Sequence, residues 1–406
     1  ETFSVAAQGA SAPKILRLRD AAGVEHKQVV KGHDDLRQDA VIQQLFRLLN
    51  DVFAESAGSR QADIRLRTFQ VVPLSPCAGI AEWVTGTVTL GEILTGNQQP
   101  SEGAHSRYRP QDWAHIACRK RMAEAREAFV QGDTGALKKA LEECYEHFKP
   151  VMRLVFLERF PSPSDWHRAR RHYARSVAVS SVVGYIVGIG DRHPNNVLFD
   201  TRTGELVHID FGITFDQGKA LRVPELVPFR LTRDLVDGLG CLGTCGLFQK
   251  CSETTMEALR ESSALVTAVV EVFVHDPVYF WSMSWSRKAR QQDGPGSNEQ
   301  QQAEQRRVRR NVAGGSGSAG ASGAAASDLQ QAGSGGGARA GGGGAKADGG
   351  NEMARRALLA VKDKLRGAHD TTAASLGVSA QVGWIIHEAM DINNLSRMYF
   401  GWQPWL

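Results

Sequence analysis

Two stretches decide the fold: residues 188–198, Gly-Ile-Gly-Asp-Arg-His-Pro-Asn-Asn-Val-Leu, and residues 207–212, Val-His-Ile-Asp-Phe-Gly. Between them, apolar residues on both sides of a short polar turn predict a β-hairpin. A hairpin returns the chain to its starting point, so we expect Asp210 to lie beside the loop that holds Asp191 and Asn196. Carboxylate and amide oxygens would then share one site, and Mg²⁺ is bound by oxygen ligands of this kind.

The spacing of these residues indicates phosphoryl transfer. That reaction needs an acid/base near the acceptor hydroxyl and oxygen ligands for metal ions that bridge the phosphates. Protein kinases use a loop Asp, an Asn five residues later and an Asp before Phe-Gly. Asp191 and Asn196 have this offset, and Asp210 precedes Phe211-Gly212. A solvated loop followed by a buried strand end is the alternative, but the combined pattern favours a phosphotransferase site.

Lys31 stands where a predicted strand enters a predicted helix over residues 35–53. A lysine at a strand end can reach phosphate oxygens, and an acid at the start of the next helix can hold it in place. Asp34 is the better candidate for this acid, because Asp35 is suited to cap the helix. Taken alone, the segment is equally a strand–helix junction with surface charges.

Alternating apolar residues predict a hairpin over 14–31 and a strand pair over 64–66 and 68–72, and an apolar stripe predicts the helix over 35–53. From about residue 89 to 285 the pattern predicts mostly helices, one of them capped by Ser164, and a further apolar stripe in the tail consists of Val382, Ile385, Ile386 and Ala389.

Residues 82–86, Glu-Trp-Val-Thr-Gly, join the predicted sheet to the predicted helical region. The backbone of Glu82 and Val84 could pair with an adenine edge while Trp83 stacks on the ring, although Trp83 could also be core packing. The small residues Ala6–Pro13 could cover phosphates, but they lack the Gly-x-Gly-x-x-Gly spacing.

Length and composition set the outer limits. The 406 residues allow two or three packed units, and a net charge of +4 is too small to indicate nucleic acid or membrane binding. No run of about 18 apolar residues exists, so we expect no transmembrane helix. Residues 287–352 are rich in Gln, Arg, Gly, Ala and Ser, which predicts a disordered insertion. An Arg-rich run within it, Arg306–Arg310, is either a nuclear import signal or a solvated basic segment.

Several blocks resemble the phosphatidylinositol-3-kinase-related protein kinases. They include VVKGHDDLRQDAVIQQLF, AEWVTGTVTLGEIL, GYIVGIGDRHPNNVLF, ELVHIDFGITFDQGK and VPELVPFRLTRDLVDGLG, and the loop order Asp-Arg-His is that of this family. Residues 376–406 resemble its terminal FATC domain. The resemblance implies an α+β, two-lobed kinase fold of the PI3K/PI4K type, with a β-rich N-lobe, a larger helical C-lobe and a helical FATC tail. The expected parts are an N-lobe over 1–85 with the hinge at its end, a C-lobe over 86–286, the disordered insertion over 287–352, and a regulatory helix with FATC over 353–406.

The resemblance also implies roles for individual residues. Lys31 would bind phosphate with Asp34 as its acidic partner, and the adenine would meet Glu82, Trp83 and Val84. Asp191 would be the catalytic acid/base, and His193 would stabilise the transferring phosphoryl group. Asn196 and Asp210 would hold Mg²⁺, or Mn²⁺ in its place, and ATP would be the phosphoryl donor.

Family members phosphorylate Ser or Thr followed by Gln in DNA-damage signalling. We therefore expect a nuclear serine/threonine kinase with protein substrates, DNA-damage sensor or activator proteins as partners, and no membrane or direct DNA-binding motif. Members also carry an N-terminal helical solenoid and a FAT region that this chain lacks, and we expect a homodimer to form through those regions. A chain without them could be an inactive piece.

Two other functions remain open at this point. A phosphatidylinositol lipid kinase shares the Gly-Asp-Arg-His and Asp-Phe-Gly elements. In the activation segment that the resemblance implies, from Ile213 to about Arg233, the acidic Asp216 and Glu225 offset the basic Lys219 and Arg222. A non-catalytic scaffold would have lost the chemical groups that this chain retains. For the aromatic C-terminal tail, docking on the kinase core competes with contact to an activator or a membrane surface.

Overall fold

The computed structural model describes residues 2–5, 13–96, 103–275, 344–368 and 375–406. The chain divides into two compact units, Glu1–Phe280 with Met353–Leu406, and Trp281–Glu352. The first unit contains all of the predicted site residues. Most of the predicted insertion, and the loop Ala6–Pro13 apart from its last residue, lie outside the described residues.

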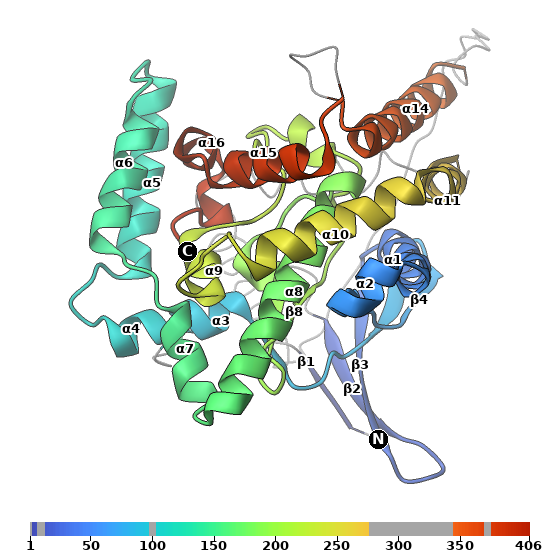
Figure 1. Ribbon diagram of the computed structural model, residues 1–406, viewed down its shortest axis with the longest axis horizontal. Coiled ribbons are helices and arrows are strands. Elements are labelled where there is room, and N and C mark those ends of the chain that lie inside the picture. The colour runs from blue at the N-terminus through green and yellow to red at the C-terminus, as the bar shows by residue number, and fades with distance from the viewer. Residues whose placement is uncertain (1, 6–12, 97–102, 276–343, 369–374) are drawn as a thin grey trace, which may run out of the picture. The chain divides into compact units, whose positions relative to one another are not determined.

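The N-terminal part is an antiparallel sheet with two helices, as expected for the N-lobe (Figure 1). The strand order is β1-β2-β3-β5-β4, and each neighbouring pair is antiparallel. The strands span Thr2–Val5 (β1), Lys14–Arg19 (β2), Glu25–Gly32 (β3), Val71–Ser75 (β4) and Ala78–Glu82 (β5), and the helices span Arg37–Glu55 (α1) and Ala57–Ala62 (α2). The predicted hairpin of β2 and β3 and the predicted helix α1 are confirmed.

One predicted strand, over residues 64–66, is wrong. Residues 64–70 are not in a strand, because side chains of α1 satisfy their backbone instead: Asn50 Oδ1 accepts from the Leu66 N–H at 2.8 Å, and Gln43 Oε1 accepts from the Phe69 N–H at 2.9 Å. The partner of β4 is β5. Pro73 lies within β4 next to a register shift, which an edge strand tolerates because its outer N–H groups need no ladder partner.

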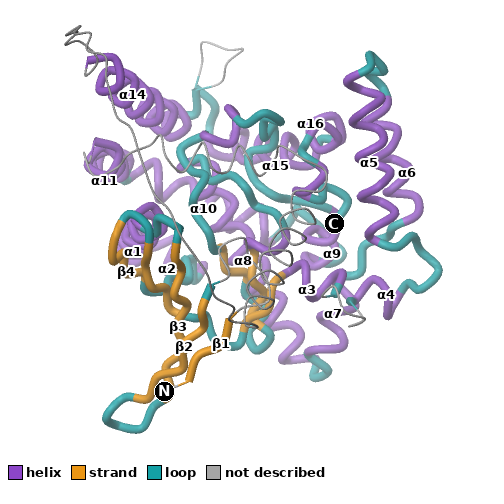
Figure 2. Tube along the Cα trace, turned by 180° about the vertical axis from the view of Figure 1, so that it is seen from behind, coloured by secondary structure: helices purple, strands orange, loops and turns teal. Residues whose placement is uncertain are grey.

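The rest of the first unit is mainly helical (Figure 2). The bounds are Leu90–Thr95 (α3), Ala104–Tyr108 (α4), His115–Val130 (α5), Ala136–His147 (α6), Met152–Arg159 (α7), Pro163–Val187 (α8), Arg233–Leu239 (α9), Leu247–Glu261 (α10), Ser263–His275 (α11), Gly344–Arg366 (α14), Val378–Met390 (α15) and Ile392–Arg397 (α16), with short 3₁₀ turns at Pro194–Asn196 (η1), Gln217–Ala220 (η2) and Phe400–Trp402 (η3). In Figure 1, α8 runs through the middle of this part with α10 packed beside it. The helix α8 is apolar and buried over its C-terminal half, from Val177 to Val187, which fixes the chain that leads into the loop with Asp191.

The predicted hairpin is present as β7 (Val197–Asp200) and β8 (Leu206–His208). A third strand, β6 (Thr87–Thr89), pairs with β7 and makes a three-stranded sheet that the sequence did not predict. Three residues are too few to show an alternating pattern. Since β6 directly follows the Glu82–Gly86 segment, this pairing anchors the end of the predicted hinge to the β7–β8 hairpin.

Two helix starts differ from the predictions. The cap of α8 is Ser162 rather than Ser164, and no side chain of the cap bonds to the helix, because Pro163 begins the helix instead. The helix α14 begins at Gly344, nine residues before the expected Met353, so part of the predicted insertion is helical.

The C-terminal tail docks on the helical part. Along α15 the predicted apolar stripe is buried except for Ile386, which is half-buried, and Trp405 is only 1% exposed. Arg230 holds the end of the tail: its guanidinium donates to the carbonyls of Trp402 at 2.7 Å, Gln403 at 2.9 Å and Leu406 at 2.9 Å. In the structure, the aromatic residues of the tail therefore pack on the helical part instead of being exposed to a membrane or an activator.

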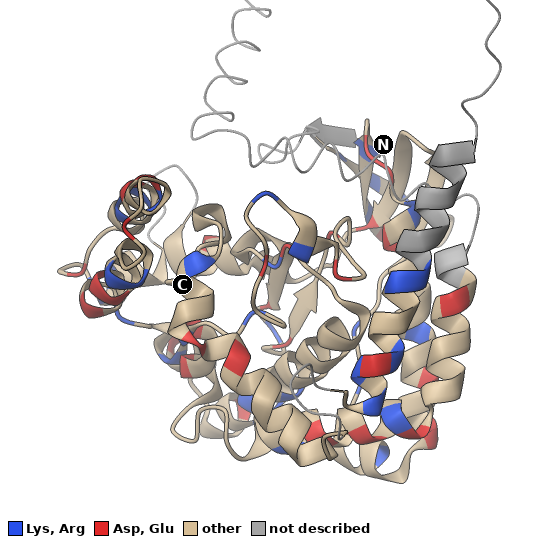
Figure 3. Cartoon of the chain, turned by 90° about the horizontal axis from the view of Figure 1, so that it is seen from above, with Lys and Arg blue, Asp and Glu red and all other residues tan. Residues whose placement is uncertain are grey.

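Charge is distributed without segregation over the described elements. Figure 3 shows acidic and basic residues side by side on the same helices, in agreement with the small net charge. Within the described ranges, no helix is both long and apolar enough to cross a membrane.

We predict that the docked tail loses stability in acid. Trp405 Nε1–H donates to His115 Nδ1 at 3.1 Å, and burial, with a further contribution from Arg119, lowers the pKa of His115 to about 4. In the unfolded chain the imidazole takes up a proton near pH 6.5, so the stabilisation is complete above that pH and is lost as the pH falls towards 4. The loss should amount to about 2–3 kcal/mol.

The measurement is the thermal unfolding midpoint from pH 7.5 to pH 4 for the wild type and for His115→Gln, which keeps an acceptor for the indole but does not titrate. His387→Gln, at an exposed site on α15, is the matched control. The wild type and His387→Gln should lose stability more steeply than His115→Gln. Parallel profiles for all three proteins would contradict the assignment.

Candidate active site

The loop that holds Asp191 begins where α8 ends. Gly188 closes the helix in the left-handed conformation, with φ 69°. A Cβ at Gly188 would lie 2.4 Å from the backbone N of Asp216, and one at Gly190 would lie 2.3 Å from Glu225 Oε2. Glycines at these positions therefore allow the activation segment to press directly against the loop.

Asp191 is held by its neighbours on both sides. Its backbone N–H donates to Glu225 Oε1 at 2.8 Å, and it adopts a left-handed conformation with φ 57°. The side-chain amide of Asn196 donates to the Asp191 carbonyl at 2.9 Å, and its nitrogen lies 3.5 Å from Asp191 Oδ2. The five-residue spacing thus produces the juxtaposition that the sequence predicted.

Arg192 joins the loop to the strand that leads to Asp210. The guanidinium is 3% exposed and donates to the carbonyls of Gly190 at 2.8 Å and Ile209 at 2.8 Å, and also to that of Asp210. Burial lowers the pKa of Arg192, while the nearby Asp191 and Asp210 carboxylates oppose this shift. Arg192 was not predicted as a residue of the site from the sequence, although its position between Asp191 and His193 could have indicated it.

The oxygen donors fit a divalent cation. Because the Asn196 nitrogen faces two acceptors of Asp191, the amide oxygen is left as the acceptor on its other side. Asp210 Oδ1 accepts from the Gly212 N–H at 3.3 Å, which orients that carboxylate. One amide oxygen and one carboxylate from adjacent segments are hard oxygen ligands of the kind that Mg²⁺ takes together with phosphate oxygens.

Three carboxylates surround Lys31. Its Nζ lies 3.5 Å from Asp34 Oδ2, as the sequence predicted. Burial alone would lower the pKa of Lys31, but Asp210, Asp39 and Asp34 outweigh it in that order, so the pKa is raised and the ammonium is kept charged. The larger effects thus come from Asp210 and Asp39 rather than from the predicted partner Asp34.

Asp39 is a site residue that the sequence analysis missed. It lies in the first turn of α1, is only 8% exposed, and its Oδ1 accepts from the Phe211 N–H at 3.2 Å. Phe211 in turn packs edge-on against Phe46 of the same helix, with ring centroids 5.4 Å apart. A charged residue on the buried face of a helix was the signal that could have identified it. Asp35 instead pairs with Arg37 at 2.6 Å, so it is engaged away from Lys31.

His193 is neutral at physiological pH. Burial lowers its pKa, and its Nδ1 accepts from the Asn195 N–H at 3.2 Å. The ring proton therefore resides on Nε2, which is available as a donor. The imidazole can offer a hydrogen bond to an anionic group but does not bring a positive charge of its own.

The predicted adenine-contact segment links the sheet-bearing part to the helical part. Glu82 ends β5 and accepts from the Gln70 N–H through Oε2 at 2.9 Å. The Trp83 ring lies under the Lys27 ammonium, 3.6 Å from its centroid. The Val84 carbonyl accepts from Thr87 Oγ1 at 2.6 Å. These contacts fix the path of the segment, and Trp83 is half-buried rather than part of the deep core.

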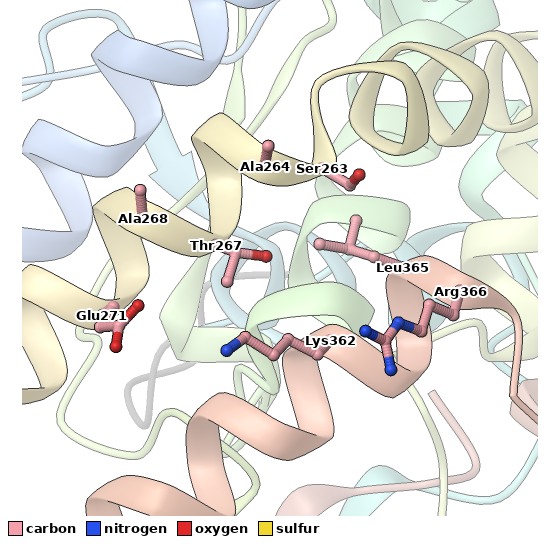
Figure 4. A pocket seen from close by; sticks show the side chains of 8 residues that line it. All are labelled: Ser263, Ala264, Thr267, Ala268, Glu271, Lys362, Leu365 and Arg366. Carbon is pink, nitrogen blue, oxygen red and sulfur yellow. The ribbon is translucent and has the colours of Figure 1, made fainter.

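One surface pocket lies apart from this network. It has a volume of about 440 Å³ and lies between α11 and α14, as Figure 4 shows. Its lining residues are Ser263, Ala264, Thr267, Ala268, Glu271, Lys362, Leu365 and Arg366. None of them belongs to the predicted site, so the assignment of the site rests on the side-chain network around Asp191 and Lys31.

Comparison with known proteins agrees with this geometry. Residues 26–283 match the family described as phosphatidylinositol 3- and 4-kinase, and residues 375–406 match the FATC domain. The chain is 38% identical to the serine-protein kinase ATM of Sus scrofa and 39% identical to the serine/threonine-protein kinase ATM of Arabidopsis thaliana, in each case over 98% of this chain. It spans only 12% and 9% of those proteins, respectively.

Solved structures give the same result. The FAT and kinase domain of CtTel1 superposes with a TM-score of 0.77 at 35% identity and covers 100% of this chain, which corresponds to 23% of that chain. A Tel1 kinase described as a butterfly symmetric dimer gives a TM-score of 0.73 at 34% identity, with 99% of this chain and 14% of that chain covered. The predicted fold and family resemblance are confirmed: the chain belongs to the phosphatidylinositol 3- and 4-kinase family, in the branch that joins this kinase domain to a FATC domain and includes ATM and Tel1.

Proposed function

We propose that this chain is the catalytic part of a serine/threonine protein kinase that transfers the γ-phosphoryl group of ATP to proteins. The observation that carries the proposal is the convergence of Asp191, Asn196, Asp210 and Lys31 in one network. The kinase family implies ATP and a divalent metal. A non-catalytic scaffold is disfavoured because every one of these groups is retained and held by its neighbours.

Different residues of the proposed site are suited to different parts of ATP. Lys31 keeps its charge and is suited to the phosphates, while the segment Glu82, Trp83 and Val84 is suited to the adenine. Asp34 lies within ion-pair distance of Lys31, and the charge of Asp39 also favours its ammonium form. Asn196 and Asp210 would hold Mg²⁺, or Mn²⁺ in its place, and the cation would neutralise charge on the phosphate oxygens.

Asp191 is proposed as the acid/base for the transfer step. The hydroxyl proton of a substrate Ser or Thr passes to the Asp191 carboxylate. The hydroxyl oxygen then bonds to the γ-phosphorus as the bond to the bridging oxygen breaks and ADP leaves. Asn196 and Glu225 hold Asp191 in position for this step, and His193 can donate from Nε2 to the transferring group.

The resemblance to ATM and Tel1 supports the finer parts of the proposal. The substrates are proteins with Ser-Gln or Thr-Gln sites, and the setting is DNA-damage and checkpoint signalling in the nucleus, with DNA-damage sensor or activator proteins as partners. A homodimer is proposed because two of the Tel1 structures that this chain resembles are described as dimers. A lipid kinase is not favoured, since the similar proteins are named as protein kinases.

We predict that Asp191→Asn removes most of the transfer activity but leaves ATP binding intact. The substitution keeps the shape of the side chain and abolishes its basicity, and acid–base catalysis contributes about 10²- to 10⁴-fold. The measurements are kcat on a protein substrate and the Kd of a fluorescent ATP analogue in the full-length protein. Asp51→Asn, on the exposed face of α1, is the control and should match the wild type. Unchanged kcat in Asp191→Asn would contradict the assigned role.

We predict that Asp39 matters more for activity than Asp34. Asp39 is buried and also bonds to the Phe211 N–H, whereas the Asp34 side chain is 42% exposed and its ion pair is screened by water. Asp39→Asn should lower kcat/KM for ATP by about ten-fold or more, the cost of weakening a buried charge-assisted interaction. Asp34→Asn should lower it by less than about five-fold. The reverse ranking would show that the sequence-derived partner is the dominant one.

We predict that the substrate is a protein and that Gln follows the phosphorylated residue. Phosphate transfer should be measured to paired peptides that differ only in Ser-Gln or Ser-Pro, and to phosphoinositide vesicles, with Asp210→Ala as the inactive reference. Ser-Gln peptides should be labelled at least about ten-fold faster, the ratio that one well-placed polar contact supplies. Equal labelling of the two peptides would refute the specificity, and labelling of vesicles alone would identify a lipid kinase.

A further inference from the structure

A second cluster of functional groups lies on the N-terminal half of α8, away from the catalytic loop. A pocket of about 120 Å³ there is lined entirely by basic side chains, namely His167, Arg168, Arg171, His172 and Arg175. Arg175 precedes Val187, the last residue of α8, by twelve positions, which corresponds to about 18 Å along the helix axis. None of these residues belongs to the proposed catalytic machinery.

The positive charges of the pocket are only partly compensated. Arg175 Nη1 pairs with Asp63 at 2.9 Å, and Arg168 Nη2 pairs with Asp165 at 2.5 Å. Arg171 has no ion pair with any of the residues that the structure describes. Three guanidinium groups therefore face two carboxylates, and both of those carboxylates lie about half-exposed to water, where pairing is weak.

Two polar atoms around the pocket lack hydrogen-bond partners within the described chain. His172 Nδ1 and Arg175 Nε are both shielded from solvent, and neither makes a hydrogen bond. Buried polar groups without a partner are rare in folded proteins, because their desolvation is not offset. A buried guanidinium N–H can only donate, so what it lacks is an acceptor.

The positive charges of the pocket also act on Cys251 of the neighbouring helix α10. Burial raises the pKa of the Cys251 thiol, and the charges of Arg175, Arg171 and Lys250 oppose that shift. These three cations therefore act together at one point beside α8. Two of these cations, Arg171 and Arg175, line the pocket, so their positive field extends from it to the neighbouring helix.

We infer that this pocket binds a phosphate group. Its volume is below the roughly 300 Å³ of sites for drug-sized ligands and suits one compact anion. Guanidinium forks match the oxygens of phosphate in a bidentate manner, and phosphate carries enough charge for the excess cations. The group is supplied either by free inorganic phosphate or by a phosphorylated protein side chain, and both present the same oxygens to Arg171 and His172.

The test uses the full-length protein with Mg²⁺ and a non-hydrolysable ATP analogue present, so that the nucleotide site is filled. The probes are inorganic phosphate and N-acetyl-phosphoserine-N-methylamide, and the observable is the broadening of the ³¹P resonance of each probe on titration. The variants are the double substitution Arg171→Gln with His172→Gln, and Lys120→Gln on α5 as a charge-matched control at an exposed site. Thermal unfolding of each variant confirms that it is folded.

We expect broadening by the wild type and by Lys120→Gln, with binding weakened about ten-fold or more in the double variant, as the loss of charge-assisted hydrogen bonds implies. Binding of inorganic phosphate alone would support the pocket and assign it to the free ion. Binding of both probes would support a phosphorylated side chain as the source. If neither probe binds, or if the double variant binds as the wild type does, the inference is overturned.

Discussion

The buried guanidinium of Arg192 is the constraint on which the site depends. It donates to carbonyls on both sides of the hairpin, at Gly190 before β7 and at Ile209 after β8. Separating the two segments would leave a charge in a low-dielectric interior without partners, which typically costs several kcal/mol. The positions of Asp191 and Asp210 relative to each other are therefore fixed by one side chain that performs no chemistry itself. Lysine could not replace it, because only the guanidinium fork reaches several fixed acceptors at once.

The sheet-bearing part is tied to this hairpin through Asp39. Its carboxylate accepts a hydrogen bond from the Phe211 backbone and its charge also acts on Lys31. One side chain of α1 therefore interacts with both Phe211 and Lys31. The T-shaped contact of Phe46 with Phe211 adds an apolar link along the same helix face. Lys31, proposed to bind phosphate, and Asp210, proposed to bind the metal, are therefore linked through Asp39 of α1 and not through the Glu82–Gly86 segment alone.

The sequence predicted those features that depend on local spacing. The offset between Asp191 and Asn196, the hairpin before Asp210 and the stripe of α1 all arise within about 20 residues, and the structure contains them. It did not predict β6, which is too short to show a pattern and exists only because β7 offers a partner. The strand expected at residues 64–66 was wrong because side chains of α1 replaced a strand partner. Asp39 was missed because its significance depends on Phe211, which lies 172 residues away in the sequence.

Arg230 positions the FATC tail in the way that Arg192 positions the loop, because its buried guanidinium bonds to backbone carbonyls. Its guanidinium is 3% exposed, and it bonds to tail carbonyls and to the Arg192 carbonyl at 3.3 Å, so the tail and the catalytic loop share one cation. Both buried arginines thus use neutral backbone oxygens as their hydrogen-bond acceptors. The docked tail and the loop that holds Asp191 are therefore positioned by the same buried side chain, and removal of the tail would leave the Arg230 guanidinium with fewer acceptors.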